Sequence, residues 1–449
     1  MKSTKVSYLA MIIFHAFIAL IIYFIPFLSK IYAILIFIIG FIIVYRSKNK
    51  NNEVLFVSAY LVGAEVLLRM TGGNLNNEYV KFSVMFFMIY GMIYSNFSRI
   101  ALIYLVFILL LIPAVFVTVL EAGNSIDIKK VLFFNLSGPF CLAICSIYMY
   151  KRKIGFHKLE NILMVMGFPI ISTTVYLFLY TPNIRDVVTG TQSNFETSGG
   201  FGPNQVSTIL GLGMFIFFTR LILFSKSKLE SFINVVLFAF ISFRGIVTFS
   251  RGGIITGVVM IVCLLFLFYF FSNTRGKIKL KLVFVLTGLL SVSIWTYSSF
   301  QTKGLIEKRY ANKDARGREK TDRLGGREQI MDAEIKLFID NAFLGVGAGL
   351  SKYKRAQELG GEVASHNEIT RLLAEHGVFG ILAFLILFAT PIVGYINNIQ
   401  HLYFFSFFLF WLLTINHAAM RTAAPAFVYA LCLLSVQIKI PEKTESTSS

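Results

Sequence analysis

Charged residues are scarce in this chain. Asp, Glu, Lys and Arg together make up 14% of its 449 residues, whereas hydrophobic residues make up 56% and Phe alone occurs 47 times. A chain of this length would ordinarily form several soluble domains, but so little charge cannot cover their surfaces. The composition therefore excludes a set of soluble domains and indicates a polytopic membrane protein.

Cysteine is also rare, with four residues in the whole chain. All four lie inside apolar runs, and their spacing fits neither a disulfide framework nor a cysteine-based metal site. We expect Cys141 and Cys145, about one helical turn apart, to share a helix face and to pack there. The other two cysteines are Cys263 and Cys432.

Apolar runs long enough to cross a hydrocarbon core of about 30 Å recur from end to end. They predict an all-α fold, a polytopic transmembrane helical bundle with about 12 to 14 spans and one large outer loop. The fourth, the ninth and the last two candidates have the weakest signal. The fourteen candidates are 6–27, 30–45, 54–70, 79–95, 99–120, 131–150, 160–181, 203–224, 231–249, 252–272, 280–300, 370–396, 402–418 and 421–438.

Acidic residues are fewer than basic ones, 23 against 42, which gives a formal net charge of +19. Such a charge can indicate nucleic-acid binding, but here most bases gather in every second connection between the spans, on one side of the membrane. The positive-inside rule produces this pattern in the cytoplasmic connections. We therefore expect a multi-pass membrane protein with both termini cytoplasmic and no nucleic-acid partner. The basic segments are 46–50, 99, 151–158, 226–228, 275–281 and 439–443.

Two longer polar segments, 182–202 and 301–365, fall on the outer side. Within the larger one, 327–340 predicts an amphipathic helix that lies at the membrane surface. Its apolar stripe comprises Met331, Ile335, Phe338 and Ile339. The glycines that follow, at 345, 347 and 349, predict tight turns. The predicted regions are 1–200 (N-terminal spans), 201–300 (further spans), 301–365 (the large outer loop) and 366–449 (C-terminal spans).

A histidine opens the polar motif His366-Asn367 on this outer side. Ser365 and Glu368 have capping-box spacing, S-x-x-E, so we expect a helix to begin here with His366 as its first residue. The positive end of the helix dipole disfavours the imidazolium form and keeps the ring able to accept a proton. The N–H groups of the same helix end can hold a phosphate. The alternative is a capping or interfacial histidine.

Arginines fall on the same side. Arg251 follows Ser250 and precedes Gly252 and Gly253, which let a ligand approach the backbone, and its guanidinium suits bidentate binding of phosphate oxygens. The alternative is a snorkelling arginine. Arg244 lies seven residues earlier and deeper on nearly the same face. An arginine inside a span usually faces a polar cavity, so we expect Arg244 to line the pocket or to pair with an acid.

Further candidates are weaker. Arg327, after Gly325-Gly326, is one of many bases in the large loop. Arg421 and His417 fall at the last outer turn and are candidates for the rim of the same cavity. Glu65 and Arg69, four residues apart in the third predicted span, predict an internal ion pair. We interpret the remaining histidines as packing or surface residues, namely His15, His157, His376 and His401.

At these residues the chain resembles the O-antigen ligase/polymerase superfamily of bacterial membrane glycosyltransferases. The resemblance covers about 200–395, whereas the N-terminal spans match only in being hydrophobic. It is strong because SRGG, the large outer loop and the histidine block occur together in this order. The matching motifs are FGPN at 201–204, SRGG at 250–253, GR at 326–327, NAFLGVGAG at 341–349 and H-N-x9-G-x-x-G at 366–380.

The resemblance implies a mechanism. An undecaprenyl-diphosphate-linked glycan is the donor, and an acceptor hydroxyl attacks its anomeric carbon on the outer, periplasmic face with inversion. His366 would be the general base, while Arg251 and Arg327 would hold the diphosphate and Arg244 would add to the pocket. Ser250, Asn204, Asn367, Gly252, Gly253 and Arg421 would support them. Because the outer face has no Asp-x-Asp pair for Mg²⁺, we expect arginines to stabilise the leaving group, with no metal and no cofactor.

The acceptor stays open in the sequence. A polymerase would use another lipid-linked glycan, and a ligase would use lipid A–core. The Arg-Leu-Leu-Ala-Glu continuation after the histidine block slightly favours an O-antigen or exopolysaccharide polymerase. Membrane lipid and a chain-length regulator are further candidate partners. The alternative of another class is a polysaccharide transporter or flippase, but transporters concentrate polar residues near mid-membrane, whereas here they gather at one face.

Overall fold

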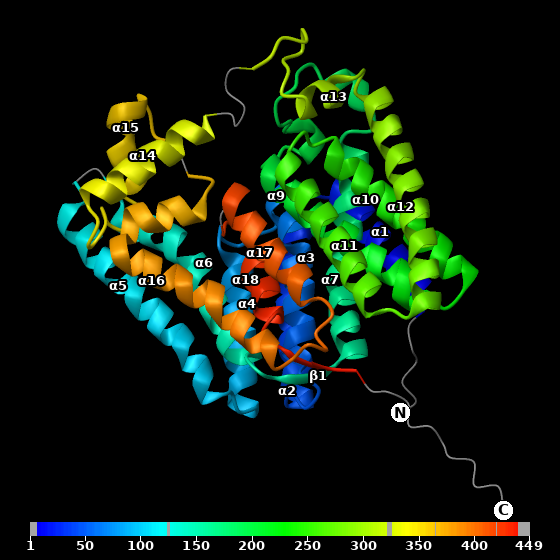
Figure 1. Cartoon of the computed structure of the whole chain (residues 1–449), viewed down its shortest axis with the longest axis horizontal. Helices are drawn as coiled ribbons and strands as arrows, with labels where there is room; N and C mark the ends of the chain where they lie inside the picture. Colours follow the sequence, from blue (N-terminus) through cyan, green and yellow to red (C-terminus); the bar gives the residue numbers. More distant parts are fainter. Residues whose placement is uncertain (1–6, 124–125, 321–325, 364, 419, 439–449) are drawn as a thin grey trace, which may run out of the picture.

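Helices make up nearly all of the structure. The computed structural model describes residues 7–123, 126–320, 326–363, 365–418 and 420–438 (Figure 1). Two short strands and three short 3-10 or π segments complete it. The elements are α1 Tyr8–Phe24, α2 Leu28–Ser47, α3 Glu53–Met70, α4 Tyr79–Tyr94, η1 Arg99–Leu102, α5 Ile103–Glu121, α6 Ile128–Met149, β1 Lys153–Gly155, α7 Phe156–Tyr180, α8 Ile184–Val187, η2 Glu196–Ser198, α9 Pro203–Thr219, η3 Arg220–Phe224, α10 Lys228–Ile246, α11 Arg251–Phe271, α12 Thr274–Gln301, α13 Leu305–Tyr310, α14 Arg327–Asp340, α15 Ser351–Leu359, α16 Glu368–Ile396, α17 Phe404–His417, α18 Ala423–Leu431 and β2 Ser435–Gln437.

Every predicted span contains a helix, which confirms the predicted fold class, but the last one, 421–438, contains only the short α18 and the strand β2. Among the described residues, nine helices are long and apolar enough to cross a membrane, and α1, α4 and α17 are shorter apolar helices, which together make twelve. The other two predicted spans are α3, which carries Glu53, Glu65 and Arg69, and α18, which has 9 residues. The chain is a multi-pass helical membrane protein.

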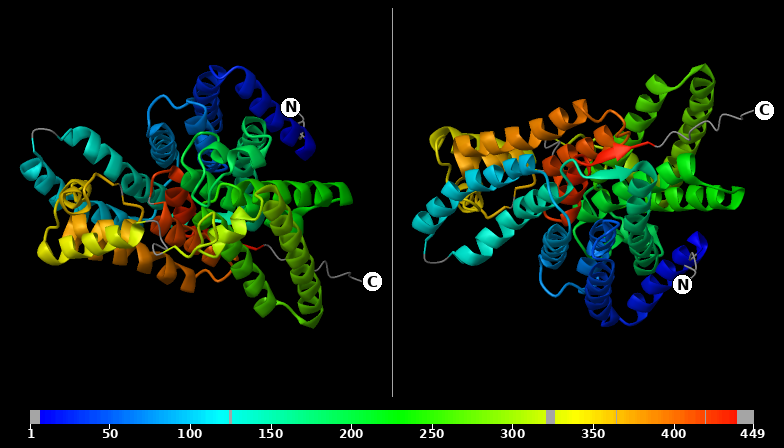
Figure 2. Two further views of the ribbon diagram at one scale, coloured as in Figure 1. Left: turned by 90° about the horizontal axis from the view of Figure 1, so that it is seen from above. Right: turned by 90° about the horizontal axis from the view of Figure 1, so that it is seen from below.

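The core lies around α9, the most enclosed of these apolar helices. Small residues let neighbouring backbones approach it, as is common where helices pack in lipid. A Cβ at Gly211 would collide with the Gly253 carbonyl of α11, and a Cβ at Gly213 would meet Ile170 and Ile241. In the end-on views of Figure 2, α5, α6 and α16 extend together as an arm away from this centre.

The two strands tie the end of the chain to the connection between α6 and α7. β1 and β2 pair in parallel, with Ile154 opposite Val436. The Lys151 N–H donates to the Leu433 carbonyl at 2.8 Å. This pairing places the segment that follows α18 on the same face as the basic connection 151–158.

Two glycine motifs meet at a kink in α16. Gly377 has φ 59° and ψ −137°, a conformation that side-chain-bearing residues rarely adopt. The Val378 N–H donates to the Ala342 carbonyl at 2.8 Å, and the Val346 N–H donates to the Ala374 carbonyl at 2.9 Å. The segment NAFLGVGAG therefore crosses the kink and fixes the first turns of α16. Gly345, Gly347 and Gly349 all have positive φ, so the tight turns predicted there are confirmed.

The predicted amphipathic helix forms with the predicted bounds, Arg327–Asp340. Its buried residues are Ile330, Ala333 and Glu334, which pack toward α16. Ile335 and Ile339 of the predicted stripe are 41% and 68% exposed. The stripe thus lies on the helix face turned away from the protein, where a membrane surface would meet it.

Candidate active site

Motifs from distant parts of the chain line one cavity of about 920 Å³. It lies near the upper end of the molecule as drawn in Figure 1, where the first residues of α9, α11 and α14 approach the segment before α16. Each helix start carries unpaired N–H groups and a partial positive charge. The lining residues are Gln192, Ser193, Phe195, Pro203, Asn204, Ser250, Arg251, Gly252, Arg309, Asn312, Asp314, Arg318, Glu319, Lys320, Arg327 and His366.

Three arginines from three elements meet in this cavity. Burial, and then the charges of Arg251 and Arg327, lower the pKa of Arg309 to about 10. Burial and the charge of Arg251 lower the pKa of Arg327. Like charges this close repel one another, so the arrangement favours an anion between them. The guanidinium geometry suits the paired oxygens of a phosphate.

Two of these arginines are oriented by neighbouring polar groups. Arg251 Nη1 donates to Asn312 Oδ1 at 2.7 Å, and Arg309 Nε donates to the Phe249 carbonyl at 3.1 Å. Phe249 has φ 59°, a left-handed conformation that is unusual for a side chain of this size. The connection between α10 and α11 is thus shaped to place Arg251 at the start of its helix and beside α13.

His366 lies half-buried in the wall of the cavity. Burial first, and then the charges of Arg421, Arg327 and His417, lower its pKa to about 4. The ring is therefore neutral near pH 7. Within the described part of the chain, its Nδ1 atom has no hydrogen-bond partner. A neutral imidazole in the wall of a cavity is suited to accept a proton.

The helix start near His366 differs from the prediction. α16 begins at Glu368, and its N-cap is Asn367, whose Oδ1 accepts hydrogen bonds from the N–H groups of Ile369 at 2.9 Å and Thr370 at 3.4 Å. The predicted capping box from Ser365 to Glu368 is wrong, and His366 precedes the helix rather than opening it. Asn367 therefore holds the helix end, and burial beside cations keeps the His366 ring neutral.

The peptide before His366 is held from two sides. Ser365 Oγ donates to Glu334 at 3.2 Å, and the Ser365 carbonyl accepts from Arg421 at 3.0 Å. Glu334 is fully buried, pairs with Arg355, and also accepts from Thr370 Oγ1 at 2.6 Å. The position of His366 thus depends on α14 and on the turn between α17 and α18.

Ser250 and Asn204 join two of the helix starts. Ser250 Oγ donates to Asn204 Oδ1 at 2.7 Å and accepts from Ser207 Oγ at 2.9 Å. These hydrogen bonds fix the start of α11 against the start of α9. Both residues line the cavity, as predicted for supporting residues, and their mutual hydrogen bonding gives them a positioning role.

The two glycines after Arg251 differ in role. Gly252 lines the cavity, and a Cβ there would collide with the ring of His417, whose Nε2 lies 3.1 Å from Thr208 Oγ1. Gly253 faces α9 instead, where a Cβ would overlap the backbone of Ser207. The prediction that both glycines admit a ligand is therefore wrong for Gly253, which admits a neighbouring helix.

Arg244 lies outside the cavity, and its predicted role in the pocket is wrong. The side chain is 1% exposed and donates to the carbonyls of Leu177 at 2.7 Å, Thr181 at 3.1 Å and Thr197 at 3.3 Å. The first two are acceptors at the end of α7, where a helix leaves carbonyls unpaired. Arg244 therefore caps α7 and joins it to η2, and no acid of the described residues pairs with it.

Arg421 is tied to the predicted ion pair in α3. Glu65 and Arg69 are 2.9 Å apart, which confirms that pair. Arg69 donates to the Arg421 carbonyl at 3.1 Å, and the Ala423 N–H donates to Glu65 at 2.7 Å. The pair thus fixes the turn that presents Arg421 to the Ser365 carbonyl.

The family model described as O-antigen ligase matches residues 235–385. Over these residues the chain is similar to the O-antigen ligase family. It lies inside the region 200–395 that the motifs indicated, and it includes Arg251, Arg309, Arg327 and His366. No curated protein matches the chain. The match supports a membrane function of the ligase or polymerase type.

Sequence reasoning missed some lining residues of the cavity. Arg309 and Asn312 come from α13 and the turn after it, and the chain offers many bases in the same loop. One feature of the sequence pointed to them. Leu305–Tyr310 begins just after the apolar run 280–300, so its side chains must lie near the membrane face. No spacing in the sequence pairs Asn312 with Arg251.

Proposed function

We propose that this protein is a membrane glycosyltransferase that joins a polyprenyl-diphosphate-linked glycan to an acceptor hydroxyl. One observation carries the proposal. Within a single cavity of the O-antigen ligase region, a half-buried neutral histidine lies with Arg251, Arg309 and Arg327. A base and a cluster of fixed cations are what transfer from a diphosphate leaving group requires.

The proposed step forms one bond and breaks another. The acceptor oxygen attacks the anomeric carbon, and the bond from that carbon to the diphosphate oxygen breaks. His366 takes the proton of the acceptor hydroxyl, and the lipid diphosphate leaves with its extra negative charge. Arg251 and Arg327 hold that charge, and Arg309 joins them because it lies in the same cluster. Attack from the face opposite the leaving group inverts the anomeric carbon.

The proposal includes an orientation. The basic connections favour cytoplasmic termini, so the cavity faces the periplasm or the outside of a bacterial inner membrane. An undecaprenyl diphosphate with its chain in the membrane would then present its glycan at the level of α13 and α14. The exposed Ile335 and Ile339 of α14 would lie in the lipid interface beside it.

The acceptor is either a second lipid-linked glycan, as in a polymerase, or lipid A–core, as in a ligase. The Arg-Leu-Leu-Ala-Glu continuation slightly favoured a polymerase. Its Arg371 pairs with Glu375 at 2.8 Å and with Glu368, and all three side chains are nearly buried. These residues thus have a structural role in either enzyme. The product of the reaction therefore decides between a polymerase and a ligase.

The test is transfer by the purified full-length protein in proteoliposomes. An undecaprenyl-diphosphate-linked oligosaccharide is offered alone or with lipid A–core, and the products are identified by mass spectrometry. We expect free undecaprenyl diphosphate together with either lengthened glycan or glycosylated lipid A–core. His157→Ala, an exposed histidine outside the cavity, serves as the control. Movement of the donor across the bilayer with no new glycosidic bond would contradict the proposal and favour a flippase.

A further inference from the structure

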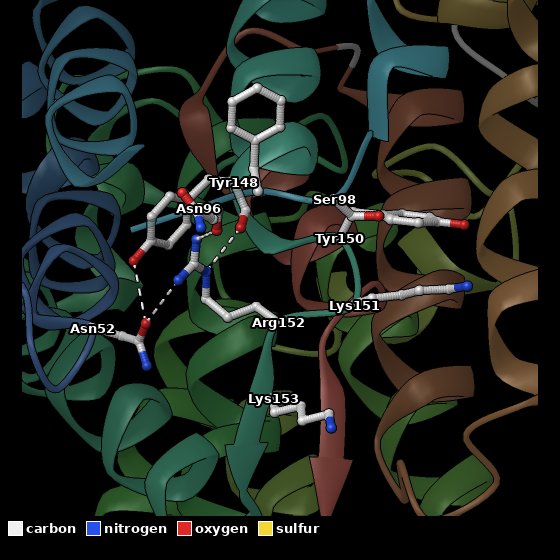
Figure 3. Close-up of a pocket in the computed structure, with 9 residues that line it drawn as sticks. Asn52, Asn96, Ser98, Tyr148, Tyr150, Lys151, Arg152 and Lys153 are labelled. Atoms are coloured by element: carbon white, nitrogen blue, oxygen red, sulfur yellow. Dashed lines mark hydrogen bonds between the residues drawn. The ribbon is translucent and has the colours of Figure 1, made fainter. Parts of the chain in front are cut away.

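A second polar pocket lies on the opposite face of the molecule. It has a volume of about 370 Å³ and is built by three connections: α2 to α3, α4 to η1, and α6 through β1 to α7. α3 runs from this pocket, beside Asn52, to Arg69 near the candidate active site. The residues that line the pocket are Asn52, Asn96, Phe97, Ser98, Tyr148, Tyr150, Lys151, Arg152 and Lys153 (Figure 3).

Arg152 forms the fixed centre of this pocket. Its guanidinium lies over the Tyr148 ring, 3.8 Å from the ring centre. Nη1 donates to Asn52 Oδ1 at 3.2 Å, Nη2 donates to the Asn96 carbonyl at 3.2 Å, and Nε donates to the Tyr148 carbonyl at 2.9 Å. These hydrogen bonds link all three connections. They use three of the five guanidinium N–H groups and leave the other two outside these bonds. The cation is thus held in place by the protein rather than ordered by a ligand.

Two exposed lysines add positive charge beside Arg152. Lys151 and Lys153 are exposed, and neither has an ion-pair partner among the described residues. In Figure 3 the Lys151 side chain extends to the right of Arg152, and Lys153 lies below Arg152. The acid in the same region is Glu53, which accepts from the N–H of Asn51 at 3.0 Å and from its Nδ2 at 3.2 Å. The pocket is therefore strongly basic.

Exposed apolar side chains adjoin the charge. Phe97 is 42% exposed in the pocket wall, and Ile100, Leu102 and Leu105 are 59%, 40% and 47% exposed just after it. They begin the lipid-facing surface of α5. A ligand that matches both parts has an anionic head and apolar chains, as an anionic phospholipid does.

We propose that this pocket binds the phosphate headgroup of an anionic phospholipid, with its acyl chains along η1 and α5. Lys151 and Lys153 supply most of the attraction, and Arg152 with Asn52 and Ser98 shapes the floor. Free phosphate shares the headgroup chemistry but lacks the chains. This proposal does not rest on the glycosyltransferase function.

The experiment is native mass spectrometry of the full-length protein, titrated with phosphatidylglycerol, phosphatidylcholine or inorganic phosphate. We expect a phosphatidylglycerol adduct, no comparable phosphatidylcholine adduct, and no displacement by millimolar phosphate. Lys151→Gln/Lys153→Gln should weaken phosphatidylglycerol binding roughly tenfold or more, since each lysine near an anionic surface contributes about fivefold in affinity. Arg152 is left unchanged because its removal would loosen three connections.

The matched control is Lys226→Gln/Lys228→Gln. It removes two exposed lysines from another connection that the charge pattern assigns to the same face. The control should leave the affinity for phosphatidylglycerol within about twofold of wild type. If both double variants weaken phosphatidylglycerol binding equally, the lysines act only through the overall charge of this face, and the proposed binding pocket is wrong. Displacement of the lipid by inorganic phosphate would overturn the choice of a lipid.

Discussion

At the scale of single residues, the candidate site depends on what each side chain can donate or accept. Arg251, Arg309 and His366 each line the cavity, but their hydrogen-bond partners differ. Arg251 donates to a side-chain amide and Arg309 to a backbone carbonyl, whereas Nδ1 of His366 has no partner among the described residues. The predicted pocket residue Arg244 has three carbonyl partners and no access to the cavity. Residue type alone does not separate these cases, because an arginine serves a helix end as well as a phosphate.

Arg251→Lys tests whether glycan transfer needs the planar guanidinium group at this position. An ammonium keeps the charge but loses bidentate donation to phosphate oxygens and the bond to Asn312. We expect transfer to fall about a hundredfold or more, an effect of about 3 kcal/mol on the barrier, with the protein still inserted and folded. Steady-state transfer rates measure this. Near-normal rates would mean that Arg251 serves only to anchor the end of α11.

The pH profile tests the environment of His366. Its pKa of about 4 predicts that activity is flat near neutral pH and falls only as the pH drops through about 4, when the base becomes protonated. Arg421→Gln removes one of the cations that depress this pKa, so the acid limb should move to higher pH. Arg421→Lys keeps the charge and should leave the limb in place. A wild-type limb near the unperturbed value of about 6.5 would contradict the assignment.

At the scale of elements, hydrophobicity predicted the helices well because each span must satisfy its own backbone in lipid. Local ends were predicted less well. Ser365 and Asn367 are both good N-cap residues, and α16 uses Asn367 because Ser365 bonds to the buried Glu334. The choice depends on α14, which lies outside the local sequence. For the same reason, the packing role of Gly253 follows from α9 and not from its neighbours in the motif.

Glu334→Gln tests how far α14 supports the histidine. The change leaves Arg355 buried without its counter-charge, which costs about 3–5 kcal/mol. We expect a lower midpoint of thermal unfolding and reduced transfer. Glu121→Gln is the matched control, because it breaks an exposed pair with Lys354, the residue beside Arg355. Equal effects of the two variants would remove the special role of the buried pair.

At the scale of the whole molecule, polar chemistry is divided between two faces. One face holds the cavity with His366 and its arginines, and the other holds the basic pocket around Arg152. The alternation of basic connections predicted the two faces from the sequence. It did not predict that α13 would complete the cavity, since Arg251 and Asn312, which are in contact, are separated in the sequence by α11, α12 and α13.

Dependence on divalent ions tests the account of the leaving group. Arg251, Arg309 and Arg327 supply positive charge for the diphosphate, so transfer should proceed unchanged in the presence of EDTA. The measurement is the transfer rate with chelator, with and without added Mg²⁺. Inhibition by EDTA that Mg²⁺ reverses would show that a metal, and not the arginine cluster alone, neutralises the leaving group.

The central claim is that His366 takes a proton from the acceptor during glycan transfer. The most direct test is a surface-glycan gel of a deletion strain that carries either the wild-type protein or His366→Ala at equal membrane levels. We expect the variant to fail, leaving single repeats on the acceptor if the enzyme is a polymerase, or bare acceptor with polymer on the lipid carrier if it is a ligase. A normal glycan pattern from His366→Ala would contradict the account.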